Sequence, residues 1–129
     1  MTEPVRRILL AEDDRFLRKA GEAALKRAGF LVLAAADGEV ALHVALTERP
    51  DLILLDLIMP KLQGFEVLRA VRRDPATAHI PVIVLSNLGQ ERDVQQALDA
   101  GATAYFVKAD LSLQELIRYV EECLSHSAA

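Results

Sequence analysis

Five short apolar segments alternate with five segments of helical periodicity along this chain, and this alternation restricts the possible folds more than any other feature. Apolar runs without polar alternation are typical of strands that are covered on both faces, as in a parallel sheet. The expected strands are Ile8–Ala11, Leu31–Ala34, Leu52–Asp56, Val82–Ser86 and Ala104–Val107. Because a helix follows each strand, the sequence predicts an α/β fold, with a parallel sheet and helices on both of its faces.

The helical segments have identifiable ends. The first is expected between Asp14, which suits an N-cap position, and Gly29, a typical stop. Its expected apolar stripe consists of Leu17, Ala20, Ala24 and Ala28. The other helices are expected from Asp37 to Arg49, Phe65 to Asp74, Glu91 to Ala100 and Ser112 to Leu124. The last one begins with a capping box, because Glu115 follows Ser112 by three residues.

A single domain over residues 5–125 accommodates all of these segments, and residues 126–129 are expected to form a short tail. Hydrophobic residues make up 52% and charged residues 26% of the 129 residues, which excludes an intrinsically disordered chain. No apolar run approaches the roughly 20 residues that a membrane helix needs. The N-terminal segment MTEPVRRILL also lacks the pattern of a signal peptide.

The cysteine content and the charge predict a location and exclude some partners. Cys123 is the only cysteine, so no intramolecular disulfide can form, and a reducing, cytoplasmic location is expected. The net charge of −4 provides no basic footprint for nucleic acid. We therefore expect neither direct nucleic-acid binding nor membrane binding.

Polar residues follow four of the expected strands. They are Glu12-Asp13-Asp14 after the first strand, Asp56 at the end of the third, Ser86-Asn87 at the end of the fourth and Lys108 after the fifth. Because ligands of open α/β sheets bind outside the carboxyl ends of the strands, we expect these side chains to share one site. Asp56 is notable, since its segment LILLDLIMP is otherwise apolar and an unpaired buried carboxylate is costly.

This set of side chains suits phosphoryl chemistry at a divalent cation. Clustered carboxylates repel one another, and a hard cation such as Mg²⁺, which prefers oxygen ligands, relieves the repulsion. Lys108 and Ser86 add a positive charge and a hydrogen-bond donor for a phosphoryl group. A carboxylate can also act as a nucleophile and form an aspartyl phosphate, which makes Asp56 the candidate acceptor.

Four motifs in this order resemble the receiver domain of bacterial two-component response regulators. They are ILLAEDD, PDLILLDLIMPKLQG, PVIVLSNLG and GATAYFVKA, and the resemblance extends from Ile8 to about Leu124. It implies a three-layer, doubly wound (βα)5 fold with a five-stranded parallel sheet of order 2-1-3-4-5.

The resemblance also implies metal-binding and acceptor roles. Asp56 corresponds to the phosphoacceptor, Asp13 to the acidic residue that binds Mg²⁺ directly, and Glu12 to its partner, which often acts through water. The main-chain carbonyl of Ile58 corresponds to a further metal ligand. Mn²⁺ is the expected substitute for Mg²⁺.

Three further residues correspond to the family's phosphoryl-binding and switch positions. Lys108 would pair with the incoming phosphoryl oxygens, Ser86 would donate its hydroxyl to the attached group, and Tyr105 would rotate inward on activation. The expected donor is a phosphohistidine on a sensor histidine kinase or a histidine phosphotransfer protein. The surface formed by the fourth helix, the fifth strand and the fifth helix would then be read by an effector. Such a domain is a phosphoacceptor that catalyses only its own phosphorylation and slow dephosphorylation, and acts as a monomer or a phosphorylation-dependent dimer.

Two residues depart from the usual family pattern. Ala109 follows Lys108 where a proline normally sits. Since a cis non-proline bond costs about 2.5–4 kcal/mol, we expect a trans peptide there. Asn87 follows the switch hydroxyl where a small residue is usual, and we hypothesise that it alters the lifetime of phospho-Asp56.

Other functions fit the sequence less well. A phosphatase with a strand-end aspartate nucleophile would need a second aspartate where this chain has Ile58, and nucleotide binding would need a glycine-rich loop after the first strand. The alternative that the sequence leaves open is a receiver-like interaction module that works without phosphorylation. It also leaves open whether the chain is a stand-alone receiver or a piece of a longer regulator.

Overall fold

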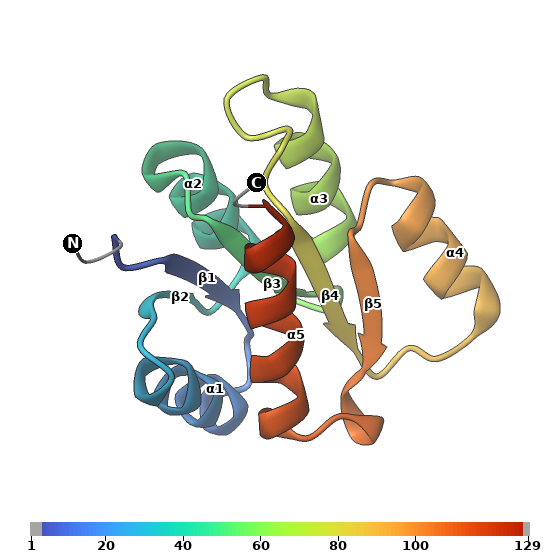
Figure 1. Ribbon diagram of the computed structural model, residues 1–129. Helices are drawn as coiled ribbons and strands as arrows, with labels where there is room; N and C mark the ends of the chain where they lie inside the picture. Colours follow the sequence, from blue (N-terminus) through green and yellow to red (C-terminus); the bar gives the residue numbers. More distant parts are fainter. Residues whose placement is uncertain (1–3, 128–129) are drawn as a thin grey trace.

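The computed structural model of the chain describes residues 4–127, and its centre is a five-stranded parallel sheet (Figure 1). The strands are β1 (Arg7–Ala11), β2 (Leu31–Ala35), β3 (Leu52–Asp56), β4 (Val82–Ser86) and β5 (Ala104–Val107). Their order is β2-β1-β3-β4-β5, and every neighbouring pair is parallel. The predicted α/β class and strand order are therefore confirmed.

Five α-helices cover the sheet on both sides (Figure 1). They are α1 (Arg15–Arg27), α2 (Gly38–Glu48), α3 (Gly64–Arg73), α4 (Glu91–Asp99) and α5 (Leu113–Ser127). Helices α1 and α5 pack on one face, and α2, α3 and α4 lie on the other. Helix α5 thus extends into the expected tail, whose residues 128–129 lie outside the described residues. No described helix combines the length and the apolar character that a membrane crossing requires.

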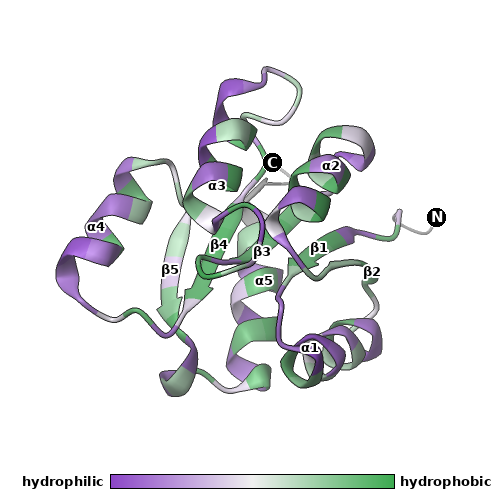
Figure 2. Cartoon of the chain, turned by 180° about the vertical axis from the view of Figure 1, so that it is seen from behind, coloured by the Kyte–Doolittle hydropathy of each residue, from purple (hydrophilic) through white to green (hydrophobic). Residues whose placement is uncertain are grey.

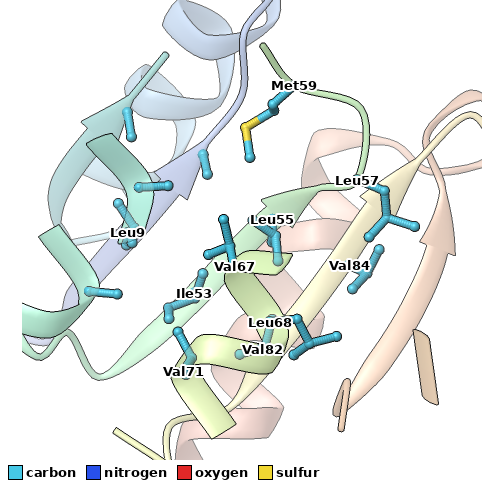
Figure 3. Close-up of a cluster of buried hydrophobic side chains, with 14 of the residues drawn as sticks. Leu9, Ile53, Leu55, Leu57, Met59, Val67, Leu68, Val71, Val82 and Val84 are labelled. Atoms are coloured by element: carbon cyan, nitrogen blue, oxygen red, sulfur yellow. The ribbon is translucent and has the colours of Figure 1, made fainter. Parts of the chain in front are cut away.

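Alternate residues of the strands supply two separate hydrophobic cores. In β1, Leu9 joins the core under α2 and α3, whereas Ile8 joins the core under α1 and α5. Figure 3 shows the first core, in which Val67 and Val71 of α3 lie over the buried face of the sheet. The central strand β3 is buried at every position, which explains its run of apolar residues without polar alternation. Helix α4 is mostly hydrophilic and buries only Ala97 (Figure 2).

The predicted helix starts agree with the observed caps. The Asp14 side chain accepts a hydrogen bond from the Leu17 N–H at 2.9 Å, as an N-cap should. In the capping box before α5, the Ser112 N–H donates to the Glu115 carboxylate at 3.1 Å, and the Glu115 N–H donates to the Ser112 hydroxyl at 3.1 Å.

The apolar stripe expected in α1 only partly faces the core, because Ala20 and Ala24 are half-buried whereas Leu17 and Ala28 are exposed. Leu17 is 45% exposed, and the buried residues of the helix are Gly21 and Leu25. A Cβ atom on Gly21 would lie 3.1 Å from a methyl carbon of Leu10, so the helix makes a close approach to β1 at its glycine. The segment offers apolar residues on more than one side of the helix, so the sequence pattern did not identify Gly21 and Leu25 as the side that packs most closely.

Candidate functional site

The polar residues at the ends of the strands converge at one edge of the sheet. Asp56 is the last residue of β3, and it lies opposite Leu85 of β4 in the parallel register. Glu12 follows β1 directly, Ser86 ends β4, and Lys108 follows β5. Neighbouring parallel strands end side by side, so residues that are far apart in the sequence meet here.

Lys108 is the centre of this cluster. Its ammonium group donates a hydrogen bond to Asp56 Oδ2 at 2.9 Å and another to Glu12 Oε1. Both carboxylates are buried: Glu12 is 5% and Asp56 is 6% exposed. Burial raises the pKa of Glu12, although the hydrogen bond from Lys108 opposes that shift. Burial also acts to lower the pKa of Lys108, but the hydrogen bonds to Glu12 and Asp56 outweigh it and hold the pKa above its usual value.

The carboxylates of Glu12, Asp13 and Asp56 form a group that fits a divalent cation. One oxygen from each lies within 4.8 Å of the others. Glu12 also accepts a hydrogen bond from the Asp14 N–H at 3.0 Å, and Asp56 accepts one from the Ile58 N–H at 3.1 Å. The Lys108 ammonium group pairs with only two of these three carboxylates, so their negative charge exceeds its positive charge, and all the candidate ligand atoms are oxygens. This donor set suits Mg²⁺ or Mn²⁺, and the exposed Asp13 leaves one side open to solvent.

Ser86 and Tyr105 are linked through the loop between β4 and α4. Ser86 is fully buried, and its hydroxyl oxygen accepts a hydrogen bond from the Leu88 N–H at 3.1 Å. The Tyr105 hydroxyl donates to the Leu88 carbonyl. Burial raises the pKa of Tyr105, so its hydroxyl stays protonated and remains a donor. The two predicted switch residues are thus linked through the main chain of Leu88.

The remaining predicted residues lie at the rim of the site. Ile58 is 55% exposed, and Asn87 and Ala109 are exposed as well. No cis peptide bond occurs among the described residues, so the Lys108–Ala109 bond is trans, as expected. A 3-10 helix over Lys108–Asp110, which the sequence pattern did not indicate, begins at the lysine itself.

Two residues that matter to the site were missed by sequence reasoning. A Cβ atom on Gly64 would lie 2.4 Å from the Asp56 carbonyl oxygen, so only glycine allows α3 to start against the end of β3. The Arg18 guanidinium donates to the carbonyls of Glu12 and Asp13 at 2.9 and 3.2 Å. Arg18 is the fourth residue of a helix that directly follows an acidic loop, and this position is the sequence signal from which its role could have been predicted.

Exposed apolar side chains border the site on the α1 side. Phe16 is 81% exposed, and Leu17 and Leu113 are 45% and 42% exposed. They line a cavity of about 310 Å³ between α1 and α5, which also reaches Glu12 and Lys108. The rim beside the buried carboxylates therefore presents an apolar surface.

Comparison with known proteins gives consistent results. The sequence pattern of the response regulator receiver domain matches residues 8–121. The chain is 42% identical over 115 residues to a gliding motility regulatory protein of Myxococcus xanthus, covering 89% of this chain and 15% of that protein. It is 40% identical over 118 residues to the DNA-binding dual master transcriptional regulator RpaA of Synechocystis, covering 92% of this chain and 48% of that protein. The chain thus spans about half or less of these curated relatives.

Solved structures with this fold match most of the chain. The receiver domain of a Francisella response regulator has a TM-score of 0.87 at 29% identity, covering 95% of this chain and 98% of that one. The receiver domain of a sensor histidine kinase from Pseudomonas aeruginosa, with a magnesium ion coordinated in its active-site cleft, has a TM-score of 0.86 at 30% identity. That match covers 95% of this chain and 99% of the other.

Proposed function

This chain belongs to the family of response regulator receiver domains, and on that basis we propose that Asp56 accepts a phosphoryl group. The donor is a phosphohistidine on a sensor histidine kinase or a histidine phosphotransfer protein. An Asp56 oxygen forms the new bond to phosphorus while the bond from phosphorus to the histidine nitrogen breaks. The observation that carries the proposal is the Lys108 ammonium group between the buried carboxylates of Asp56 and Glu12, beside Asp13.

Each residue of the site has a role in this proposal. Glu12, Asp13, Asp56 and the main-chain carbonyl of Ile58 would hold Mg²⁺, or Mn²⁺ in its place. The ion, when bound, would offset the negative charge of the transferring phosphoryl oxygens. The Lys108 ammonium group, which is hydrogen-bonded to Asp56, would stay beside this residue and pair with an oxygen of the incoming phosphoryl group. Catalysis of phosphoryl transfer comes mainly from positioning the reacting groups and stabilising their charge. Lys108 and the bound ion would therefore supply most of it.

The attached phosphoryl group would act as a switch through Ser86 and Tyr105. Ser86 would exchange its contact with the Leu88 N–H for the phosphoryl oxygens, and Tyr105 would move into the space that it leaves. The hydrogen bond from Tyr105 to the Leu88 carbonyl supports this coupling, because Leu88 leads into α4. Helix α4 buries only one residue, so a shift of its position costs little packing. An effector would read the resulting surface of α4, β5 and α5.

The partners follow from the family in part. Receiver domains pair with sensor kinases, so a kinase is the expected donor. The effector is open, and the expected absence of nucleic-acid binding has no support from the relatives, since one of them is a DNA-binding regulator. A cytoplasmic location and a monomer or phosphorylation-dependent dimer remain part of the proposal. Asn87, exposed beside Ser86, is proposed to change the lifetime of phospho-Asp56.

A phosphorylation-independent interaction module is the second candidate, favoured by the departures at Asn87 and Ala109. Intact mass after incubation with Mg²⁺ and a small acyl phosphate distinguishes the two functions. We expect the parent to gain one phosphoryl group and Asp56→Asn or a chelated sample to gain none. A folded parent that gains no mass from an active donor would favour the interaction module.

A further inference from the structure

Arg18 of α1 binds main-chain carbonyls of the acidic loop between β1 and α1. Its Nη1 donates to the Glu12 carbonyl at 2.9 Å and to the Asp13 carbonyl at 3.2 Å. We propose that Arg18 is a positioning residue, which fixes this loop so that Glu12 and Asp13 direct their carboxylates to one divalent cation. The inference rests on the proposed function, since it concerns the same metal site.

The acidic loop has a physical need for such a restraint. Two successive residues, Glu12 and Asp13, place carboxylates within 4.8 Å of Asp56, and like charges at this distance favour a loop that opens. Lys108 and the Asp14 N–H hold the Glu12 side chain, and the Glu12 N–H donates to the Ala35 carbonyl at 3.0 Å. These contacts all restrain Glu12. Asp13 is exposed, and Arg18 holds its peptide group through the carbonyl.

The chemistry of arginine suits this role better than that of lysine. Both bonds come from Nη1, whose two N–H groups are fixed in the plane of the guanidinium group, so this one nitrogen can bind two successive carbonyls and set their relative orientation. An ammonium group carries the same charge but lacks this fixed geometry. Arg18→Lys therefore keeps the charge beside the acidic loop and removes most of the orientation.

The charge of Arg18 and its hydrogen bonds act on a bound cation in opposite directions. A permanent positive charge near the site repels Mg²⁺ and weakens binding, whereas an ordered loop strengthens it. The two effects can therefore be separated by comparing Arg18→Lys, in which only the geometry changes, with Arg18→Gln, in which the charge is lost as well.

The experiment is a Mg²⁺ titration at 25 °C, followed by the amide resonances of residues 12–14 and without any phosphoryl donor. We expect the Kd of Arg18→Lys to rise about 10-fold, as is usual when a group that orients a metal ligand is changed. Arg15→Lys is the matched control, because Arg15 is exposed on the same helix, and its Kd should equal that of the parent. Circular dichroism of each variant establishes that it is folded at this temperature.

Two outcomes would overturn the role of Arg18. An unchanged Kd in Arg18→Lys together with tighter binding in Arg18→Gln would make its effect purely electrostatic. A parent that binds no Mg²⁺ would refute the proposed metal site itself. In that case amide hydrogen exchange of residues 12–14 in chelator decides the role of Arg18: the proposal requires faster exchange in Arg18→Lys than in Arg15→Lys, and equal rates would refute it.

Discussion

The ammonium group of Lys108 lies 2.9 Å from Asp56 Oδ2, although the two residues are 52 positions apart in the sequence. The same group also binds Glu12, so one cation serves two buried carboxylates. The lysine therefore already lies beside the carboxylate that would attack phosphorus in the proposed transfer, so no large rearrangement is needed for it to pair with an oxygen of the incoming phosphoryl group.

Replacing Lys108 tests how far its charge stabilises the two buried carboxylates. We expect Lys108→Met to lower the free energy of unfolding in chelator by about 1–3 kcal/mol, because Glu12 and Asp56 lose their shared donor. Mg²⁺ should then raise the Tm of the variant by more than it raises the Tm of the parent. Thermal unfolding with and without Mg²⁺ measures both effects. Lys19→Met, at an exposed position on α1, is the control, and equal Mg²⁺ effects in all three proteins would contradict the prediction.

Gly64→Ala should be strongly destabilising. The added Cβ would lie 2.4 Å from the Asp56 carbonyl oxygen and 2.6 Å from Leu57 Cα, so the backbone at the end of β3 would have to move. We expect a loss of about 1–3 kcal/mol or more, measured by urea unfolding. Gly89→Ala is the matched control, since its nearest contact would be a methyl group of Val107 at 3.6 Å. Equal stability of the two variants would refute this explanation.

Arg72 stabilises the fold by joining α3 to two other main-chain segments, the loop before β4 and the turn at Gly101. Its guanidinium donates to the carbonyls of Gly101, Ala78 and Ile80 at 2.9, 3.1 and 2.6 Å. We expect Arg72→Met to lower the free energy of unfolding by about 1–3 kcal/mol, because the partly buried hydrogen bonds to Gly101 and Ile80 lose their charged donor. Arg73→Met, at the exposed neighbouring position, should change stability little. A loss of the same size in both variants would show that the three hydrogen bonds contribute nothing.

The lowered pKa of Asp37 predicts that the stability of the fold depends on pH in the acid range. The hydrogen bond from the Val40 N–H, followed by the charge of Lys61, holds the pKa of Asp37 below its usual value. A carboxyl group with a lowered pKa in the folded state stabilises the fold above its unfolded pKa of about 3.9, and the effect disappears as the pH falls through the folded pKa. We therefore expect the Tm of the parent to exceed that of Asp37→Asn above about pH 5, and the difference to shrink on acidification. A Tm difference that is constant between pH 7 and pH 3 would be inconsistent with this account.

We expect Phe16 to contact a protein that donates a phosphoryl group, but not a small-molecule donor such as acetyl phosphate. It is 81% exposed and lines the cavity beside Glu12 and Lys108, and aromatic residues are enriched at protein interfaces. We expect Phe16→Ser to slow phosphoryl transfer from the cognate kinase about 5-fold or more, and to leave phosphorylation by acetyl phosphate unchanged. Val40→Ser, at an exposed position on α2, is the control. Slower reaction with both donors would place the effect in the site rather than at an interface.

Much of the fold was readable from local sequence patterns. The strand positions, the cap at Asp14 and the capping box at Ser112 depend on residues that are close in the sequence, so they could be predicted. The buried side of α1 could not. The helix carries apolar residues on more than one side, and only its packing against β1, with a close approach at Gly21, decides that Gly21 and Leu25 are the buried residues.

The sequence by itself determined which residues stand at the strand ends, because burial on both faces imposes continuous apolar runs that end at Asp56 and Ser86. Only the tertiary structure decided the contacts among them. The contact of Lys108 with Glu12 joins residues 96 positions apart, and it exists because the parallel order of the strands brings their ends to one edge. The support of the acidic loop by Arg18 likewise depends on the path of a side chain across the start of α1. Such contacts are set by the packing of whole elements, so no local pattern specifies them.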